Sequence, residues 1–141
     1  MPNLKEKEYR KFEDIKYMRK DGSEYWSARE LADVLDYSQW RNFQKVIDRA
    51  MIACESSGHE VAYDFAEVSK IVEAGATSKS IKDYELTRYA CYLIMQNGDP
   101  RKEVIAFGQT YFAIQTYRQE IADHFNQLDE DRRRLVVRGD I

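Results

Sequence analysis

The chain has 141 residues, of which 43% are hydrophobic and 33% charged, a composition that indicates one domain with a buried core. Its net charge of −3 argues against a strongly basic nucleic-acid-binding protein. Neither an apolar run of membrane-spanning length nor a secretory leader is present, so we expect a cytoplasmic protein, with no membrane contact and with Cys54 and Cys91 reduced.

The first part of the sequence predicts a charged tail followed by a β-hairpin. Residues 1–11 are mostly charged and are interpreted as a tail. The pair Asp21-Gly22 is a turn signal, with apolar and aromatic residues on either side of it. We therefore expect a hairpin that ends near Trp26.

A helix-turn-helix-like pair is predicted next. Ser27 and Glu30 have the spacing of a capping box, with Trp26 and Leu31 placed as a hydrophobic staple. This first helix is short, and Ser38 is expected to cap a second helix that runs from Gln39 to about Glu55. Two helices joined by so few residues favour a helix-turn-helix arrangement.

The outer face of the second helix is the candidate DNA-binding surface. Arg41, Lys45 and Arg49 follow one another at four-residue steps, which places three like charges in a row. Phosphates would relieve that repulsion, and Gln39 and Asn42 could bond base edges. The alternative is a solvated face with a basic bias, because Asp48 lies beside the row. The acidity of the chain lies in residues 51–100, where 8 acidic side chains face 4 basic ones.

Residues 60–84 allow two interpretations. The spacing of Val68, Ile71 and Val72 suits a helix, whereas the segment from Gly75 to Lys79 suits the turn of a second hairpin.

Two helices with a short corner follow. Asn97-Gly98 is expected to end the first helix with left-handed backbone, while Asp99 and Pro100 begin the second, which runs to about Arg134. Gly108 is expected to allow close approach of a neighbouring backbone. Phe107, Ile114, Ile121 and Leu128 repeat every seven residues. The apolar residues predict either a homodimer through local antiparallel pairing of Ile121, Phe125 and Leu128, or a helix that breaks near Asp123 or Gln127 and folds back on its own hairpin.

The sequence has no motif for catalysis, cofactor binding or metal binding. His59 and His124 stand alone, neither cysteine has a ligand-spaced partner, and the acids are interpreted as exposed partners of Lys and Arg. We therefore expect no enzymatic activity, no cofactor and no metal. Several polar residues lie on or beside apolar helix faces, and they either tie the helix corner together or form a surface for a partner or for DNA: Arg88, Gln96, Asn97, Gln109 and Gln115.

Five stretches carry a family resemblance: residues 26–31, 53–59, 88–94, 96–100 and 108–116. They resemble the DNA-damage-inducible protein D family, over roughly residues 12–138. That family is similar to the N-terminal domain of BRO proteins, a DNA-binding module of viruses and phages. The resemblance favours the hairpin for residues 60–84. It also implies a place in the bacterial SOS response and antagonism of the RecA recombinase on single-stranded DNA.

The expected fold is α+β, mainly helical with a helix-turn-helix-like pair and small β-hairpins. The expected domain covers residues 12–128, between the charged tail 1–11 and a C-terminal helical tail, 129–141. The expected function is a DNA-damage (SOS) response regulator that binds DNA and acts at RecA-type recombinase filaments. The alternative is a pure protein-interaction module or a phage-type antirepressor, in either case without enzymatic activity.

Overall fold

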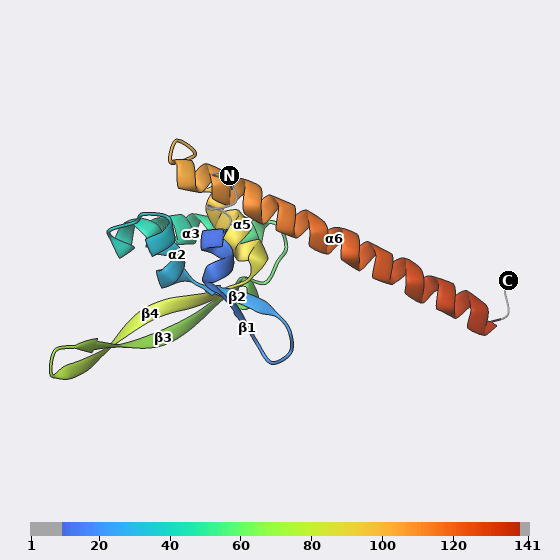
Figure 1. The fold of residues 1–141 in the computed structure, drawn as a ribbon, viewed down its shortest axis with the longest axis horizontal. Helices are drawn as coiled ribbons and strands as arrows, with labels where there is room; N and C mark the ends of the chain where they lie inside the picture. Colours follow the sequence, from blue (N-terminus) through green and yellow to red (C-terminus); the bar gives the residue numbers. More distant parts are fainter. Residues whose placement is uncertain (1–9, 139–141) are drawn as a thin grey trace.

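The structure, a computed structural model, describes residues 10–138, with side chains as far as residue 134 (Figure 1). The predicted tail 1–11 therefore lies almost wholly outside the described residues. Residues 10–14 are helical. The elements that follow are β1 (Lys16–Met18), β2 (Glu24–Ser27), α2 (Ala28–Val34), α3 (Trp40–Ser56), α4 (Val61–Asp64), β3 (Phe65–Ala74), β4 (Thr77–Leu86), α5 (Arg88–Gln96) and α6 (Glu103–Arg138).

The strands form one sheet, which corrects the predicted fold class. Both hairpins exist, but β2 pairs with β4, so that the sheet has the order β1-β2-β4-β3 and is antiparallel throughout. Trp26 lies opposite Leu86 in that pairing, and both side chains are fully buried. Burial of these two side chains in one core brings the hairpins together. The fold is a mixed α+β domain in which helices predominate, as predicted, but one four-stranded sheet replaces the predicted small, separate hairpins.

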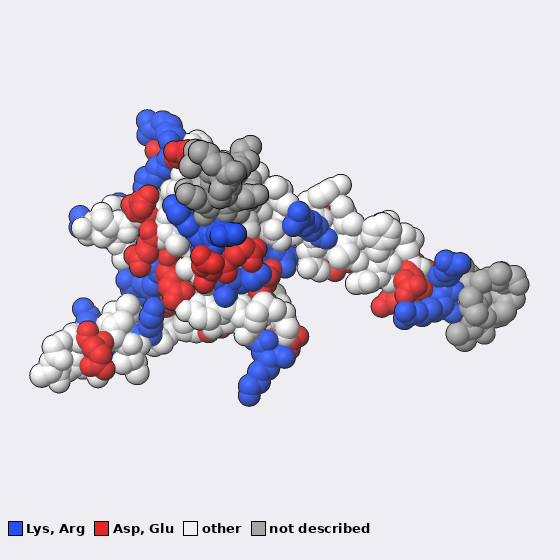
Figure 2. Space-filling view, viewed as in Figure 1, with Lys and Arg blue, Asp and Glu red and all other residues white. Residues whose placement is uncertain are grey.

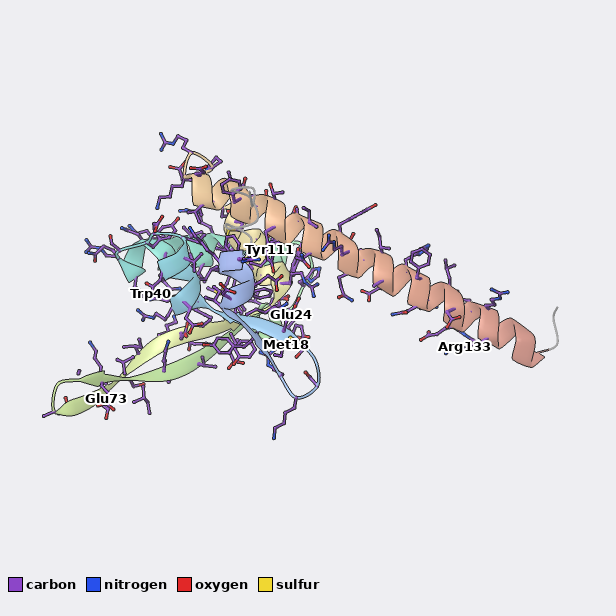
Figure 3. All side chains as sticks on the ribbon, viewed as in Figure 1. Met18, Glu24, Trp40, Glu73, Tyr111 and Arg133 are labelled. Carbon is purple, nitrogen blue, oxygen red and sulfur yellow. The ribbon has the colours of Figure 1, made fainter. Side chains whose placement is uncertain are left out.

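The β3–β4 hairpin settles the open interpretation of residues 60–84. Its ten-residue strands are in register from Phe65↔Leu86 to Ala74↔Thr77, so the helical alternative is wrong. The turn is only Gly75-Ala76, and Gly75 has φ of 69°, which glycine adopts without strain. The half of the hairpin near Glu73 projects from the body of the domain (Figures 1 and 3).

An aromatic cluster fixes α6 against the sheet. Phe112 lies 5.4 Å from the ring of Phe12 and 5.2 Å from the ring of Trp26, and all three side chains are fully buried. The indole nitrogen of Trp26 donates a 2.9 Å hydrogen bond to the carbonyl oxygen of Phe12. Gly108 is also buried, but its close neighbours are the side chains of Met95 and Phe12, not the backbone that we expected.

The N-terminus of α2 follows the local sequence signal, and the N-terminus of α3 does not. Ser27 caps α2 as predicted, accepting a hydrogen bond from the Glu30 amide at 3.4 Å. The Glu30 carboxylate does not close the capping box; it accepts a 2.6 Å bond from the Tyr17 hydroxyl. Ser38 does not cap α3. Gln39 occupies that position, without a side-chain capping bond.

The corner between α5 and α6 also differs from the prediction. Asn97 ends α5 with φ of −99°, and its side-chain amide donates to the carbonyl oxygen of Leu93. No left-handed residue is therefore needed. Asp99 accepts from the amide of Arg101 in a separate turn, so that α6 begins at Glu103.

Helix α6 is continuous from Glu103 to Arg138 and extends far beyond the body of the domain (Figure 1). It passes through Asp123 and Gln127 without a break, so the predicted alternative of a helix that folds back there is wrong. Within residues 10–138, none of the helices combines the length and apolar character required to cross a bilayer.

Candidate nucleic-acid interface

The outer face of α3 is fixed by the residues on its inner face. Phe43, Ile47 and Ala50 are fully buried in the core. Because a helix turns about 100° per residue, this places Arg41, Lys45 and Arg49 on the opposite side, and all three are exposed. The predicted row is therefore one continuous strip of solvent-facing cations.

The cations of this strip form no direct ion pairs with acids of the described chain, although the exposed Asp48 carboxylate beside them offsets part of their charge. Among the described residues, none of Arg41, Lys45 and Arg49 forms an ion pair with a carboxylate. Asp48, the acid beside the row, accepts a 2.9 Å hydrogen bond from Gln44 instead. Arg49 donates to the backbone oxygen of Asn97 at 3.4 Å, a contact that leaves its charge uncompensated.

A fourth cation, Arg29, joins the strip from the side of the sheet. The guanidinium of Arg29 lies 3.8 Å from the centre of the Trp40 ring, and its Nε donates to the carbonyl oxygen of Lys82 at 2.7 Å. Gln44 donates to the Tyr84 hydroxyl at 3.0 Å. These contacts hold β4 beside α3, with Trp40 at that edge of the body (Figure 3).

A third segment reaches α3 from the other side. The amine of Lys102 lies 4.1 Å from the centre of the Tyr37 ring, and that ring lies 5.0 Å from Phe43. The corner before α6 is thereby placed beside the start of α3. Asp36 and Glu103 line the same hollow as Lys102 and Lys11, so positive and negative charges are balanced on this flank.

Together these groups form a basic surface, defined here as Arg29, Arg41, Lys45, Arg49 and Lys102. It combines residues from α2, α3 and the α5–α6 corner. Sequence reasoning found the three members on α3 but missed Arg29 and Lys102, because their places depend on tertiary contacts with Trp40 and Tyr37. Figure 2 shows Lys and Arg interspersed with Asp and Glu on the side of the body where α2 and α3 lie.

Gln39 and Asn42 lie at the N-terminal end of this surface. Both side chains are exposed, and the side chain of Gln39 is not used in capping. In helix-turn-helix proteins the N-terminal residues of the second helix reach base edges. The position of these two amides is compatible with that role.

The second group of predicted polar residues does not form a single surface. Arg88 donates from Nε to Glu24 at 2.7 Å, and Gln109 donates to the carbonyl oxygen of Met95 at 3.0 Å. These two contacts tie α5 to the sheet and to α6, whereas the bond from Asn97 to Leu93 only closes the end of α5. Gln96 lies in a groove between α5 and α6, and Gln115 lines a small pocket on α6.

Two acidic residues contradict the expectation that the carboxylates are exposed partners of Lys and Arg. Asp64 and Asp83 are only 5% and 4% exposed. Asp64 accepts from the Thr87 hydroxyl at 2.5 Å, and Asp83 accepts from the Ser27 hydroxyl at 2.7 Å. Both carboxylates therefore hold helix N-termini. In the described part of the chain, His, Cys, Asp and Glu residues form no cluster arranged to bind a metal ion.

Comparison with known proteins identifies the family of this domain. Residues 14–113 match the BRO family, N-terminal domain, and this match covers more than half of the chain. The chain belongs to the BRO family. It is also similar to DNA damage-inducible protein D of Escherichia coli (strain K12), with 53% identity over 133 residues that cover 92% of this chain and 48% of the relative. This confirms the resemblance seen in the sequence.

The chain spans about half the length of this curated relative. No solved structure was found to match the chain.

Proposed function

We propose that this BRO-family domain is a non-enzymatic regulator of the DNA-damage response that binds DNA through its basic surface and acts at RecA-type recombinase filaments. The observation that carries the proposal is the row of Arg41, Lys45 and Arg49, which is exposed and has no acidic partner among the described residues. The name of the relative, DNA damage-inducible protein D, supports the biological setting.

The geometry of α3 is suited to a phosphate backbone. Four residues of a helix rise about 6 Å, so the three cations are spread over about 12 Å. Long side chains at these spacings can each approach a different phosphate and release its condensed counterions. Arg29 and Lys102 extend the surface on either side, and Gln39 and Asn42 supply amides for base edges. Phosphate contacts provide the affinity, and the amides provide any sequence preference.

A second candidate is a protein-interaction module, such as a phage-type antirepressor. It is favoured by a groove of about 390 Å³ between α5 and α6. Tyr89, Tyr92, Leu93 and Tyr117 line that groove. Tyr117 is exposed and Tyr89 and Tyr92 are half-buried, and tyrosine is enriched at protein interfaces. In this case the domain would bind a recombinase or repressor directly, and the basic surface would only steer the encounter.

The deciding experiment is an electrophoretic shift with single- and double-stranded DNA at two salt concentrations. Replacing Arg41, Lys45 and Arg49 by Gln should weaken binding and lower the slope of log affinity against log salt by about 2 to 3 units. The matched control replaces Arg132, Arg133 and Arg134 by Gln, which removes the same charge at the far end of α6 (Figure 3). A folded α3 variant with unchanged affinity and slope would overturn the DNA-binding proposal.

Recombinase filaments assembled on single-stranded DNA separate the two candidates. DNA binding through α3 predicts that the α3 variant also loses its effect on filaments. The alternative outcome is an α3 variant that loses binding to DNA without recombinase and still acts on filaments. If Tyr92→Ala then abolishes the effect on filaments, the protein-interaction candidate is correct.

A further inference from the structure

Helix α6 has apolar residues on two opposite faces. Ile105, Gly108 and Phe112 face the core and are buried. Successive residues of an α-helix are rotated by about 100° around its axis. By this rotation, the apolar side chains farther along α6 lie about 180° from Phe112, on the other side of the helix. This outer stripe consists of Ile114, Tyr117, Ile121, Phe125 and Leu128, which are 38%, 63%, 37%, 65% and 50% exposed. The body packs mainly against the opposite face and reaches the stripe only near its start, where Tyr117 also lines the groove between α5 and α6.

The spacing of the apolar residues in the outer stripe is the same from either end. The intervals are three, four, four and three residues, with Ile121 at the centre. If a second copy of α6 runs antiparallel across Ile121, Ile114 lies opposite Leu128, Tyr117 lies opposite Phe125, and Ile121 meets itself. A two-fold axis requires such self-complementarity, because the same patch must serve on both subunits. We propose that α6 pairs in this register with α6 of a second copy of the chain.

The charges beside the stripe fit the same register. Arg118 lies next to Ile121 and Phe125 on the helix surface, and among the described residues it forms no ion pair. In the antiparallel pair it lies on the same side of the seam as Asp129 of the second copy, displaced by five residues, which is about 7.5 Å. The two side chains lean toward each other, because each points toward the N-terminus of its own helix. Asp129 already pairs with Arg133 of its own helix at 2.6 Å, so Arg118 adds a second cation to this carboxylate, and the two-fold axis repeats the contact.

The available space also fits a second helix. Most of the stripe lies on the part of α6 that extends away from the body, and Figure 2 shows few charged residues there before the charged block near the end of the helix. At the Ile114 end, a shallow pocket of about 130 Å³ is lined by Tyr111, Ile114, Gln115 and Arg118. The register brings Leu128 of the second copy to this end.

The size of the seam sets the expected affinity. From Ile114 to Leu128 it is about 21 Å long, which places the interface at the lower end of the range for specific complexes. The pairing is therefore expected in the micromolar range. Aromatic residues at two of the five positions are the largest contributors, because they bury the most area.

Sedimentation equilibrium tests the pairing. The wild-type chain should be dimeric at tens of micromolar. Phe125→Glu should be monomeric at the same concentration, because it places a charge in the seam. The matched control is Asn126→Glu, which adds the same charge to the adjacent residue on the side facing away from the stripe, and it should remain dimeric. A monomeric wild type overturns the proposal, as does a Phe125→Glu variant that stays dimeric.

Disulfide trapping tests the register. Single variants Ile114→Cys and Leu128→Cys should form a mixed disulfide when combined, because the antiparallel seam places these positions opposite each other. Neither variant should crosslink efficiently with itself. The native Cys54 and Cys91 are buried and give little background. If Ile114→Cys crosslinks with itself in preference to Leu128→Cys, the helices run parallel and the proposed register is wrong.

Discussion

Asp83 on β4 accepts a 2.7 Å hydrogen bond from the hydroxyl of Ser27, the residue that caps α2. The other carboxylate oxygen of Asp83 accepts from the backbone amide of Arg29 at 3.0 Å. A buried carboxylate from the sheet therefore completes the N-terminus of a helix that lies more than 50 residues earlier in the chain. The relationship positions α2, and with it the Arg29 side chain beside Trp40.

Ser27→Ala should lower the free energy of unfolding by about 2 kcal/mol. About 1 kcal/mol comes from the lost cap and the remainder from the lost bond to a buried carboxylate. Thermal or urea denaturation measures the change. Ser38→Ala is the matched control, because Ser38 is exposed and does not cap α3. Equal losses in the two variants would contradict the assignment of the cap.

A second buried carboxylate holds α5. The hydroxyl of Thr87 donates to Asp64 at 2.5 Å and accepts from the amide of Ala90 at 3.2 Å, which makes Thr87 the N-cap of that helix. Thr87→Val keeps the shape but removes both bonds, so the free energy of unfolding should fall by about 2 to 3 kcal/mol. The control is Thr77→Val beside the hairpin turn, where the residue is exposed. A Thr87→Val melting curve that overlays the wild type would rule out this role.

Short-range patterns in the sequence predicted the parts of the fold that depend on neighbouring residues. The Ser27 cap, the Asp21-Gly22 hairpin and the buried face of α3 all belong to this class. The pairing of Trp26 with Leu86 joins segments 60 residues apart, and no local signal indicates that the two hairpins share one sheet. The burial of Asp64 and Asp83 was missed for the same reason, because each is compensated by a partner from a distant segment.

For the candidate site too, the sequence predicted the residues that depend on local periodicity and missed those that depend on tertiary contacts. Arg41, Lys45 and Arg49 follow from helical periodicity alone. Arg29 and Lys102 reach the same surface through contacts with aromatic rings, and those contacts exist only once the helices have packed. Whether these residues bind DNA stays a prediction.

Gly108 tests the packing of α6 on α5. A Cβ atom at this position would lie 2.5 Å from the sulfur of Met95 and 3.1 Å from Cζ of Phe12. Gly108→Val should lower the free energy of unfolding by about 1 to 3 kcal/mol, the usual cost of overpacking a core. Chemical denaturation measures it, with Thr110→Val as the control on the exposed side of the same helix. An unchanged midpoint for Gly108→Val would show that α6 does not approach Met95 this closely.

The pH dependence of stability should reveal the environment of Cys54. Burial raises the pKa of this thiol to about 11 from its usual value of 9.0, and the neighbouring Asp64 carboxylate adds to the shift. Below pH 9.0 the thiol is protonated in both the folded and the unfolded chain, so it has no effect on stability there. Between pH 9.0 and about 11 only the unfolded chain loses the proton, which favours unfolding.

The free energy of unfolding should therefore fall more steeply with pH in the wild type than in Cys54→Ala across pH 9 to 10.5. Cys54→Ala is less stable at neutral pH because it leaves a small cavity, so the comparison uses the slopes and not the absolute values. The tyrosines, the lysines and Cys91 are present in both proteins. The difference between the two pH slopes of the free energy of unfolding is therefore due to Cys54. The same environment predicts that the folded chain resists alkylation at Cys54 at pH 8, since the thiolate is the reactive species. Parallel slopes together with rapid alkylation of the folded protein would show that the Cys54 thiol of α3 is not buried against Asp64.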